Sequence, residues 1–242
     1  MNSKGEKLPI QKSDSWKMFN HISPKYDFLN HLLSFGLDIL WRKKMTKFIV
    51  DRKSLKVLDV ATGTADVLLS FFQHNPYMHL GFGIDMADKM LEVGRKKVQE
   101  KGLEKHIKLQ SADANKIPFD DDTFDMVSIA FGIRNMEDPL KVLREMNRVL
   151  NKEGRALVLE FSLPENKWMR SLHLFYLRNV VPFLGGLFTG EQKAYKYLNQ
   201  TIETFPYGKE FCKLLTQAGY VNVKANPLFF GIATIYQGDK LR

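Results

Sequence analysis

Apolar and polar residues alternate along the middle of the chain with two different periods, which predicts strands and helices in turn. Short apolar runs are typical of strands buried on both faces of a sheet, and the segments between them repeat apolar residues at helical spacing. The expected strands are Val57–Val60, Leu80–Ile84, Ile107–Gln110, Phe124–Ala130 and Arg155–Phe161, and the expected helices are Asp66–His74, Ala87–Lys101 and Leu140–Leu150. Strands separated in this way predict a mostly parallel, doubly wound sheet.

The end of the chain departs from this alternation. A helix is expected at Lys209–Ala218, followed by the strand-like runs Tyr220–Ala225 and Phe229–Gln237, with the link Asn226-Pro227-Leu228 between them. So short a link predicts an antiparallel pair at one edge of the sheet. The expected fold is therefore α/β, with a doubly wound, mostly parallel, seven-stranded sheet. This Rossmann-like arrangement is the one class I methyltransferases have, which is an analogy of fold alone.

The rest of the chain surrounds this sheet. Residues 1–54 are expected to form a helical N-terminal cover, with helices at Ser15–Phe19 and Leu37–Val50. Residues 55–162 should form a nucleoside-binding core, residues 163–205 an apolar helical insertion, and residues 206–242 the last helix and strand pair. The cover and the insertion should lie near the carboxyl ends of the strands, where α/β proteins bind their ligands.

Composition narrows the class of protein. The 242 residues are 44% hydrophobic and 26% charged, as in a globular protein with one large core. The single cysteine argues against a disulfide framework, and no metal site is expected. The net charge of +9 points to anionic surroundings, and no apolar run is long enough for a membrane span. We expect a cytoplasmic protein that is soluble or peripheral to the inner face of the cell membrane.

The turn within Lys56–Asp66 indicates the ligand. Asp59 ends the first strand, Gly63 lies in a turn of small residues, and Asp85 ends the next strand about 20 residues later, as in a nucleoside-binding βαβ unit. The turn has one of the three glycines that a dinucleotide site requires, and Asp66 at the start of the helix would repel a phosphate. A cationic nucleoside without phosphates, such as S-adenosylmethionine, fits better than a dinucleotide. An ordinary strand-turn-helix remains open at this point.

A third acid follows the third strand. Asp113 can accept a hydrogen bond from an adenine amino group, and the small Ala114 leaves room for the ring. Acids at successive strand ends are better explained by one shared ligand than by separate turn caps. Met86, next to Asp85, completes the cofactor site that we expect from the residues.

Motifs along nearly the whole chain, from about Phe19 to Lys240, resemble those of the ubiquinone/menaquinone-biosynthesis C-methyltransferases. They occur in the same order and at the same spacing as in that family. The matching residues are Tyr26-Asp27, Asn30, Leu33–Gly36, Trp41-Arg42, Phe131–Asn135, Arg148–Leu150, Leu159–Ser162, Pro164, Tyr195–Leu198, Phe205-Pro206, Gly231–Ala233, Gly238 and Lys240.

The resemblance implies cofactor contacts at Thr64, Asp85, Asp113 and Ala114. The chain also departs from the family pattern. Ala65 replaces a glycine and should tighten the space beside the cofactor, and Ala130 replaces a serine that contacts the cofactor in some members. Asp38 stands where the family often has histidine, which leaves the role of that histidine unassigned.

The same resemblance implies methylation of a ring carbon of a polyprenyl hydroquinone. The substrate would be demethylmenaquinol, which would become menaquinol, or 2-polyprenyl-6-methoxy-benzoquinol. One enzyme could also methylate both. We expect Arg134 nearest the quinol, with Asn135 beside it and Tyr26 from the N-terminal cover. Arg134 would stabilise a phenolate or orient a water. Its alternative role is structural, as the ion-pair partner of Asp27 or Glu160, and His21 is a base candidate by chemistry alone.

The isoprenoid tail of such a substrate gives the apolar insertion a role. Its side chains would line a channel or enter the membrane interface, with Arg170 and Arg178 at anionic headgroups. Packing on the protein's own core is the alternative, and assembly as a homo-oligomer or with other quinone-biosynthesis enzymes is left open. The side chains concerned are Trp168, Leu172, Phe175, Tyr176, Val180, Phe183, Leu184 and Phe188.

Other functions remain to be weighed. A methyltransferase acting on RNA or on another small molecule would fit the basic charge, but Phe131–Asn135 carries no base-reading element, and we expect no nucleic-acid partner. A non-catalytic domain that binds a nucleoside or a partner protein is opposed by the intact set of acids together with the intact motif Phe131–Asn135 after the fourth strand. A nicotinamide-dependent reductase is opposed by the missing glycines.

Overall fold

A seven-stranded sheet forms the centre of the computed structural model, which describes residues 10–189 and 192–241. The strand order is β3-β2-β1-β4-β5-β7-β6; β1 to β5 pair in parallel, and β7 is antiparallel to both of its neighbours. This confirms the predicted doubly wound, Rossmann-like sheet. The strands are β1 Leu55–Val60, β2 Met78–Asp85, β3 Ile107–Ser111, β4 Phe124–Ala130, β5 Leu150–Phe161, β6 Tyr220–Leu228 and β7 Ala233–Lys240.

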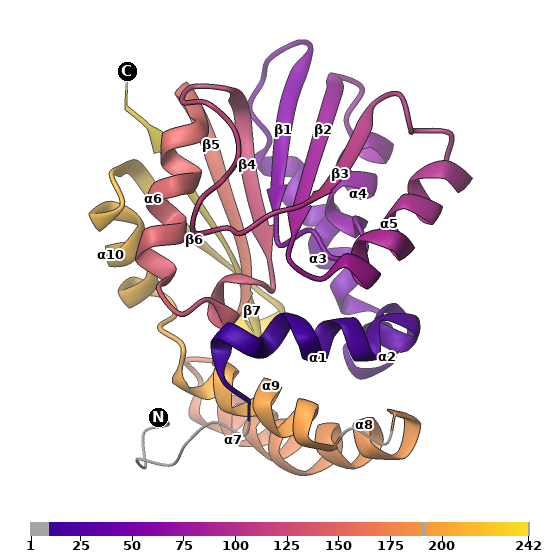
Figure 1. Ribbon diagram of the computed structural model, residues 1–242. Coiled ribbons are helices and arrows are strands. Elements are labelled where there is room, and N and C mark those ends of the chain that lie inside the picture. Colours follow the sequence, from indigo (N-terminus) through magenta and orange to yellow (C-terminus); the bar gives the residue numbers. More distant parts are fainter. Residues whose placement is uncertain (1–9, 190–191, 242) are drawn as a thin grey trace.

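Helices cover both faces of this sheet (Figure 1). Side chains alternate between the faces along each strand, so Val57 of β1 joins one apolar cluster and Leu58 joins the other. The first cluster also holds residues of α3 (Leu37–Met45), α4 (Asp66–His74) and α5 (Asp88–Glu100), and the second holds residues of α6 (Pro139–Val149) and α10 (Lys209–Gln217). Both faces are apolar, which explains the continuous apolar runs in the sequence.

The remaining helices lie across one end of the sheet. In Figure 1, α1 (Ser15–Ile22) and α2 (Tyr26–Leu33) cross this end, and α7 (Lys167–Phe175), α8 (Val181–Thr189) and α9 (Gln192–Thr204) form a further layer. A π-helical turn, Tyr176–Val180, joins α7 to α8. A third apolar cluster ties this layer to α2. Its buried members are Leu29, Leu163, Leu177, Val181, Ala194, Tyr195 and Ile202.

Three boundaries differ from the sequence-based prediction. The predicted link Asn226-Pro227-Leu228 is part of β6, and the chain reverses instead at Phe229–Gly231, where all three residues have positive φ. Pro227 is tolerated because β6 is an edge strand. β5 starts at Leu150, inside the predicted helix end. The predicted helix Leu37–Val50 stops at Met45 and is followed by a short 3-10 turn, Thr46–Phe48.

The apolar insertion does not supply a membrane-crossing element. Within residues 10–189 and 192–241, no helix has both the length and the apolar character that a membrane span requires. The side chain of Phe188, one of the expected tail contacts, lies outside the part of the structure that is described.

Candidate active site

The turn after β1 and the end of β2 are held together by one carboxylate. Asp85 Oδ2 accepts a hydrogen bond from the Gly63 amide at 2.9 Å, and Oδ1 accepts one from the Ala87 amide at 2.8 Å. Burial raises the pKa of Asp85, while these two amides favour its ionised form. The carboxylate is therefore fixed at the strand end, with lone pairs left for a ligand's hydroxyl groups.

Two glycines keep the backbone near this point open. Gly63 has a φ of +55°, which favours glycine, and lies at the turn itself. Gly132, after β4, approaches the loop after β1 so closely that a Cβ there would meet the Ala61 methyl at 2.7 Å. Gly132 thus lets the loops after β1 and β4 pack closely together, and both glycines face a space at the ends of these strands.

A cavity of about 230 Å³ occupies this space, and we call it the cofactor cavity. The structure brings five of the predicted cofactor residues to its wall, namely Gly63, Asp85, Met86, Asp113 and Ala114. Ala130 also lines it with a methyl group only. The N-terminal helices close it through Ser15, Trp16 and Phe19, and Lys12 lies beside them.

Asp59 does not line the cofactor cavity, although the sequence placed it with Asp85 and Asp113. Its side chain is 1% exposed and points into the protein, where it accepts hydrogen bonds from Ser128 Oγ at 2.6 Å and Thr62 Oγ1 at 2.7 Å. Burial raises its pKa to about 7 despite these two bonds. Asp59 therefore ties β1 to β4 beneath the site.

Thr64 and Ala65 also lie away from the cofactor cavity wall. Thr64 Oγ1 donates a hydrogen bond to Asp27 of α2 at 2.7 Å, and Lys97 Nζ contacts Thr64, Asp27 and Asp66 within 3.0 Å. This network fastens the N-terminal cover to α4 and α5. The sequence suggested that the Ala65 methyl would tighten the space beside the cofactor. In the structure this methyl is buried in the apolar core and does not line the cofactor cavity.

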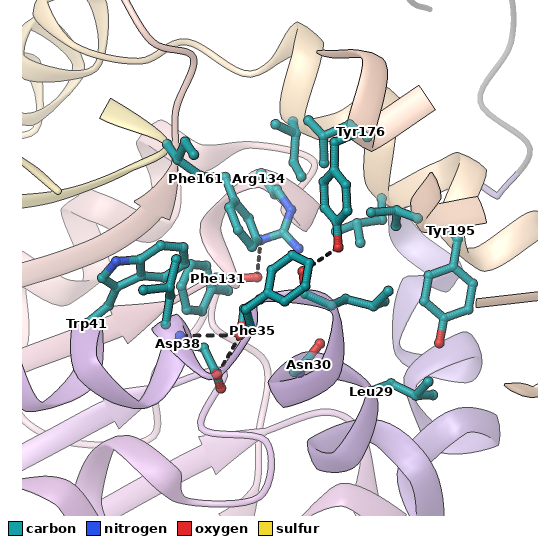
Figure 2. Close-up of a pocket in the computed structure, with 18 of the residues that line it drawn as sticks. Leu29, Asn30, Phe35, Asp38, Trp41, Phe131, Arg134, Phe161, Tyr176 and Tyr195 are labelled. Atoms are coloured by element: carbon teal, nitrogen blue, oxygen red, sulfur yellow. Dashed lines mark hydrogen bonds between the residues drawn. The ribbon is translucent and has the colours of Figure 1, made fainter. Parts of the chain in front are cut away.

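A second, larger cavity of about 410 Å³ adjoins the first, and we call it the acceptor cavity. Its wall is mostly apolar and comes from α2, α3, the π-helical turn and α9, with Leu29, Phe35, Trp41, Phe161 and Tyr176 among the side chains drawn in Figure 2. Four residues line both cavities: Phe19, Tyr26, Phe131 and Asn135. The predicted catalytic residues Arg134, Asn135 and Tyr26 all line the acceptor cavity.

Arg134 forms a buried ion pair with Glu160, one of the two partners that the sequence suggested. Its Nη1 lies 2.8 Å from Glu160 Oε1 and also donates to the Phe131 carbonyl. Burial raises the pKa of Glu160, and the Arg134 guanidinium opposes this shift. Arg134 Nε and Asn135 Oδ1 are buried and have no hydrogen-bond partner in the part of the chain that the structure describes. Such atoms are uncommon in proteins and call for a ligand or water.

The other polar residues of the acceptor cavity divide into partnered and unpartnered ones. Asp38 accepts hydrogen bonds from His31, Ser34 and Arg42. His173 of α7 is 8% exposed, and its Nε2 has no hydrogen-bond partner within residues 10–189 and 192–241. Burial lowers the pKa of His173, so its ring is neutral at neutral pH. Sequence reasoning missed His173 because only the fold brings α7 to the cavity. His21, the base candidate, is exposed and lines neither cavity.

The residues present fit S-adenosylmethionine. The Asp85 carboxylate suits the two ribose hydroxyls, Asp113 suits an amino donor, and Ile84, Met86 and Ala114 offer apolar contact to a purine ring. A Rossmann-like sheet with this site next to an apolar cavity defines an S-adenosylmethionine-dependent methyltransferase.

Comparison with known proteins identifies the family. The chain belongs to the ubiE/COQ5 methyltransferase family, whose model matches residues 7–240. It is 42% identical to the ubiquinone/menaquinone biosynthesis C-methyltransferase UbiE of Geotalea uraniireducens, with 99% of each chain covered. It is 40% identical to the demethylmenaquinone methyltransferase of Thermus thermophilus, with 92% of this chain and 100% of that one covered.

Solved structures agree on the fold alone. A SAM-dependent methyltransferase from Aquifex aeolicus has a TM-score of 0.59 at 20% identity, covering 83% of this chain and 89% of that one. The [4+2]-cyclase SpnF has a TM-score of 0.63 at 15% identity, covering 96% and 97%. Since a cyclase shares the fold, the reaction has to be argued from the site.

Proposed function

We propose that the protein transfers a methyl group from S-adenosylmethionine to a ring carbon of a polyprenyl hydroquinone. The acceptor is demethylmenaquinol, 2-polyprenyl-6-methoxy-benzoquinol or both. The names of the relatives, a quinone-biosynthesis C-methyltransferase and a demethylmenaquinone methyltransferase, support this acceptor class.

The observation that carries the proposal is the junction of the two cavities. Tyr26, Phe131 and Asn135 belong to both walls, so a ring held there would lie beside the cofactor. The rest of the acceptor cavity is apolar and suits an isoprenoid chain. A ring with polar substituents and an apolar tail matches this division better than a nucleotide does, because a nucleotide would leave phosphates in an apolar space.

Arg134 and Asn135 suit one hydroxyl group. Among the described residues, the Arg134 Nε–H donor and the Asn135 Oδ1 acceptor have no hydrogen-bond partner. A hydroxyl both donates and accepts, so one that reaches both atoms would satisfy them. A quinone carbonyl only accepts and would leave Asn135 Oδ1 unpaired. This argument favours the reduced, hydroquinone form of the acceptor.

The chemistry requires electron density on the ring carbon. When bound, S-adenosylmethionine supplies the methyl group on a positive sulfur. Arg134, fixed by Glu160, stabilises the negative charge that grows on the oxygen next to the reacting carbon. Burial raises the pKa of Tyr26, which keeps it protonated as a donor. His173 is the neutral ring in the cavity wall suited to accept the hydroxyl proton. After methyl transfer the ring carbon still carries its hydrogen, and loss of this proton to a base or to water restores the aromatic ring. The oxygen next to that carbon then takes up a proton, so the reaction releases one proton overall.

Exposed apolar side chains around the acceptor cavity support contact with an anionic membrane. Phe35, Leu172 and Phe229 are exposed and also line this cavity. Trp168, Phe175 and Phe183 are exposed on the same outer helices, and Arg170 lies among them. Apolar and basic side chains together favour the headgroup boundary, from which a polyprenyl tail would enter. Binding to anionic but not neutral vesicles at low salt tests this contact, and failure to bind either would refute it.

The enzymatic test uses purified protein, S-adenosylmethionine and reduced acceptor under anaerobic conditions. We expect a methylated quinol by mass spectrometry from the demethylmenaquinol or benzoquinol substrate. Arg134→Met should abolish this product while S-adenosylmethionine still binds. No product from either quinol, with cofactor binding intact, would contradict the proposed acceptor, and methylation of bulk RNA instead would favour the rival function.

A further inference from the structure

The polar groups of the cofactor cavity follow the order of the strands. Asp113 lies after β3 and Asp85 ends β2, and the next strands in the sheet are β1, with Gly63 in the turn after it, and β4. The two acids suit the adenosine part of the cofactor. The methionyl part must then extend over β1 toward β4, because the sheet continues only in that direction from the acids.

The methionyl end carries a carboxylate, which needs a cation or several N–H donors. The acidic side chains in the cavity wall, those of Asp85, Asp113 and Glu137, cannot bind this carboxylate because they would repel it. Among the described residues that line the cofactor cavity, Lys12 is the only one with a basic side chain. Lys97 contacts Thr64 in the turn after β1, but it is paired with Asp27 and Asp66 at 2.6 Å and does not line the cavity.

Lys12 lies at the required end of the cavity. It belongs to the short segment Lys12–Asp14 that precedes α1, and its Nζ donates a hydrogen bond to the Met136 carbonyl at 3.1 Å. Met136 follows β4, on the side of the cavity opposite Asp113. The ammonium has three N–H groups, so two remain after this bond.

We infer that Lys12 binds the carboxylate of S-adenosylmethionine and thereby closes the N-terminal segment over the cofactor. Burial lowers the pKa of Lys12 and the Arg134 guanidinium adds to this effect, while the Glu160 and Glu137 carboxylates oppose it without reversing it. A ligand carboxylate beside Lys12 would further favour its charged form. Ser13, Ser15 and Trp16 of the same segment complete the wall. The inference concerns the cofactor and stands whichever acceptor the enzyme uses.

The decisive experiment compares two ligands that differ only in this carboxylate. Isothermal titration of the full-length wild-type protein would measure the dissociation constants of S-adenosylmethionine and of decarboxylated S-adenosylmethionine. We expect wild type to prefer the carboxylated form about 10- to 100-fold, as for a charge-assisted hydrogen bond. Lys12→Met should reduce this ratio to about one, because only the carboxylated ligand loses a contact. Lys12→Arg should keep most of it.

Lys17→Met is the matched control, because Lys17 is exposed on the neighbouring helix and pairs with Asp14. It should keep the wild-type ratio. A purely structural role of Lys12 would weaken both ligands equally and leave the ratio unchanged. That result, or equal binding of the two ligands by wild type, would overturn the inference. The wild-type measurement decides the matter even if a Lys12 variant folds poorly.

Discussion

The two cavities treat their polar groups in opposite ways. In the cofactor cavity, both oxygens of Asp85 accept backbone amides, and Asp113 Oδ1 accepts from Asn115. In the acceptor cavity, Arg134 Nε and His173 Nε2 have no hydrogen-bond partner among the described residues, and neither has Asn135 Oδ1 where the two cavities meet. The cofactor cavity is thus held in shape by its own hydrogen bonds, whereas the acceptor cavity keeps unsatisfied groups inside an apolar wall. Such groups cost stability until a ligand binds them.

Arg134 should produce the largest effect, because it holds a buried ion pair in the wall of the acceptor cavity. Arg134→Met leaves the Glu160 carboxylate buried without its cation, and we expect a loss of about 3–5 kcal/mol in the free energy of unfolding. Urea denaturation would measure it. The double variant Arg134→Met with Glu160→Gln should regain much of this loss, since no charge is then stranded. A loss below about 1 kcal/mol in the single variant would mean that the ion pair between Arg134 and Glu160 contributes little to the stability of the folded protein.

Asp85→Asn should affect the cofactor cavity and spare the acceptor cavity. The amide cannot accept from both Gly63 and Ala87 as the carboxylate does, and it loses the charge that strengthens bonds to ribose hydroxyls. The dissociation constant of S-adenosylmethionine should rise about 10- to 100-fold by titration calorimetry. Asp88→Asn, at an exposed position on α5, is the control and should bind normally. Equal losses in both variants would contradict a specific role for Asp85.

His173→Phe tests whether unpaired groups in the acceptor cavity cost stability. The ring keeps its bulk but loses the unpartnered Nε2, so the free energy of unfolding should increase by about 1 kcal/mol. Turnover of the quinol should fall while cofactor affinity stays unchanged. His74→Phe, at an exposed position, should change neither the free energy of unfolding nor the turnover of the quinol. A destabilised His173→Phe protein would show that Nε2 is not a burden in the folded state.

Asp59 gives a pH dependence that the exposed acids lack. Its folded-state pKa is about 7, above the ordinary 3.8, so between these values the folded protein holds a proton that the unfolded chain has released. This contribution is present below pH 4 and is lost as the pH rises to about 7, at about 1 kcal/mol per pH unit. The difference in unfolding free energy between wild type and Asp59→Asn should follow this slope. Parallel pH curves for the two proteins would refute it.

Ala65→Gly should have the smallest effect, because three terms nearly cancel. Glycine relieves the positive φ of +66°, worth about 1 kcal/mol. It also gives up a buried methyl group, at about 0.8 kcal/mol, and adds about 0.4–1 kcal/mol of unfolded-chain entropy. The net change in unfolding free energy should stay below about 1 kcal/mol, with unchanged cofactor affinity. A clear gain in affinity would revive the idea that Ala65 crowds the cofactor.

The same contrast explains how far the sequence could predict the molecule. The cofactor cavity lies at strand ends, and strand ends follow from local patterns, so the sequence could bring Gly63, Asp85 and Asp113 to one place, and all three line this cavity. Asp59 does not line it, because the same spacing fits a side chain pointing outward to a ligand or inward to Ser128. No local pattern distinguishes these two cases.

The acceptor cavity depends on segments that are distant in sequence. α2, the loop after β4 and α9 meet only in the folded chain, so motif matching could name Tyr26, Arg134 and Asn135 but could not reveal that His173 joins them. Pro227 misled the prediction of the last turn, since a proline interrupts an inner strand but is accepted at an edge.

The π-helical turn at Tyr176–Val180 gives the outer layer an adjustable joint. Such a turn holds one residue more than an α-helical turn, and each residue rotates a helix by about 100°. Deleting one residue there would swing the side chains of α8 by that angle relative to α7. Side chains such as Phe183, now facing outward, would change direction while every sheet contact stayed in place. Single-residue insertions and deletions in this turn could therefore change the length and shape of the acceptor cavity during evolution, without altering the chemistry at the strand ends.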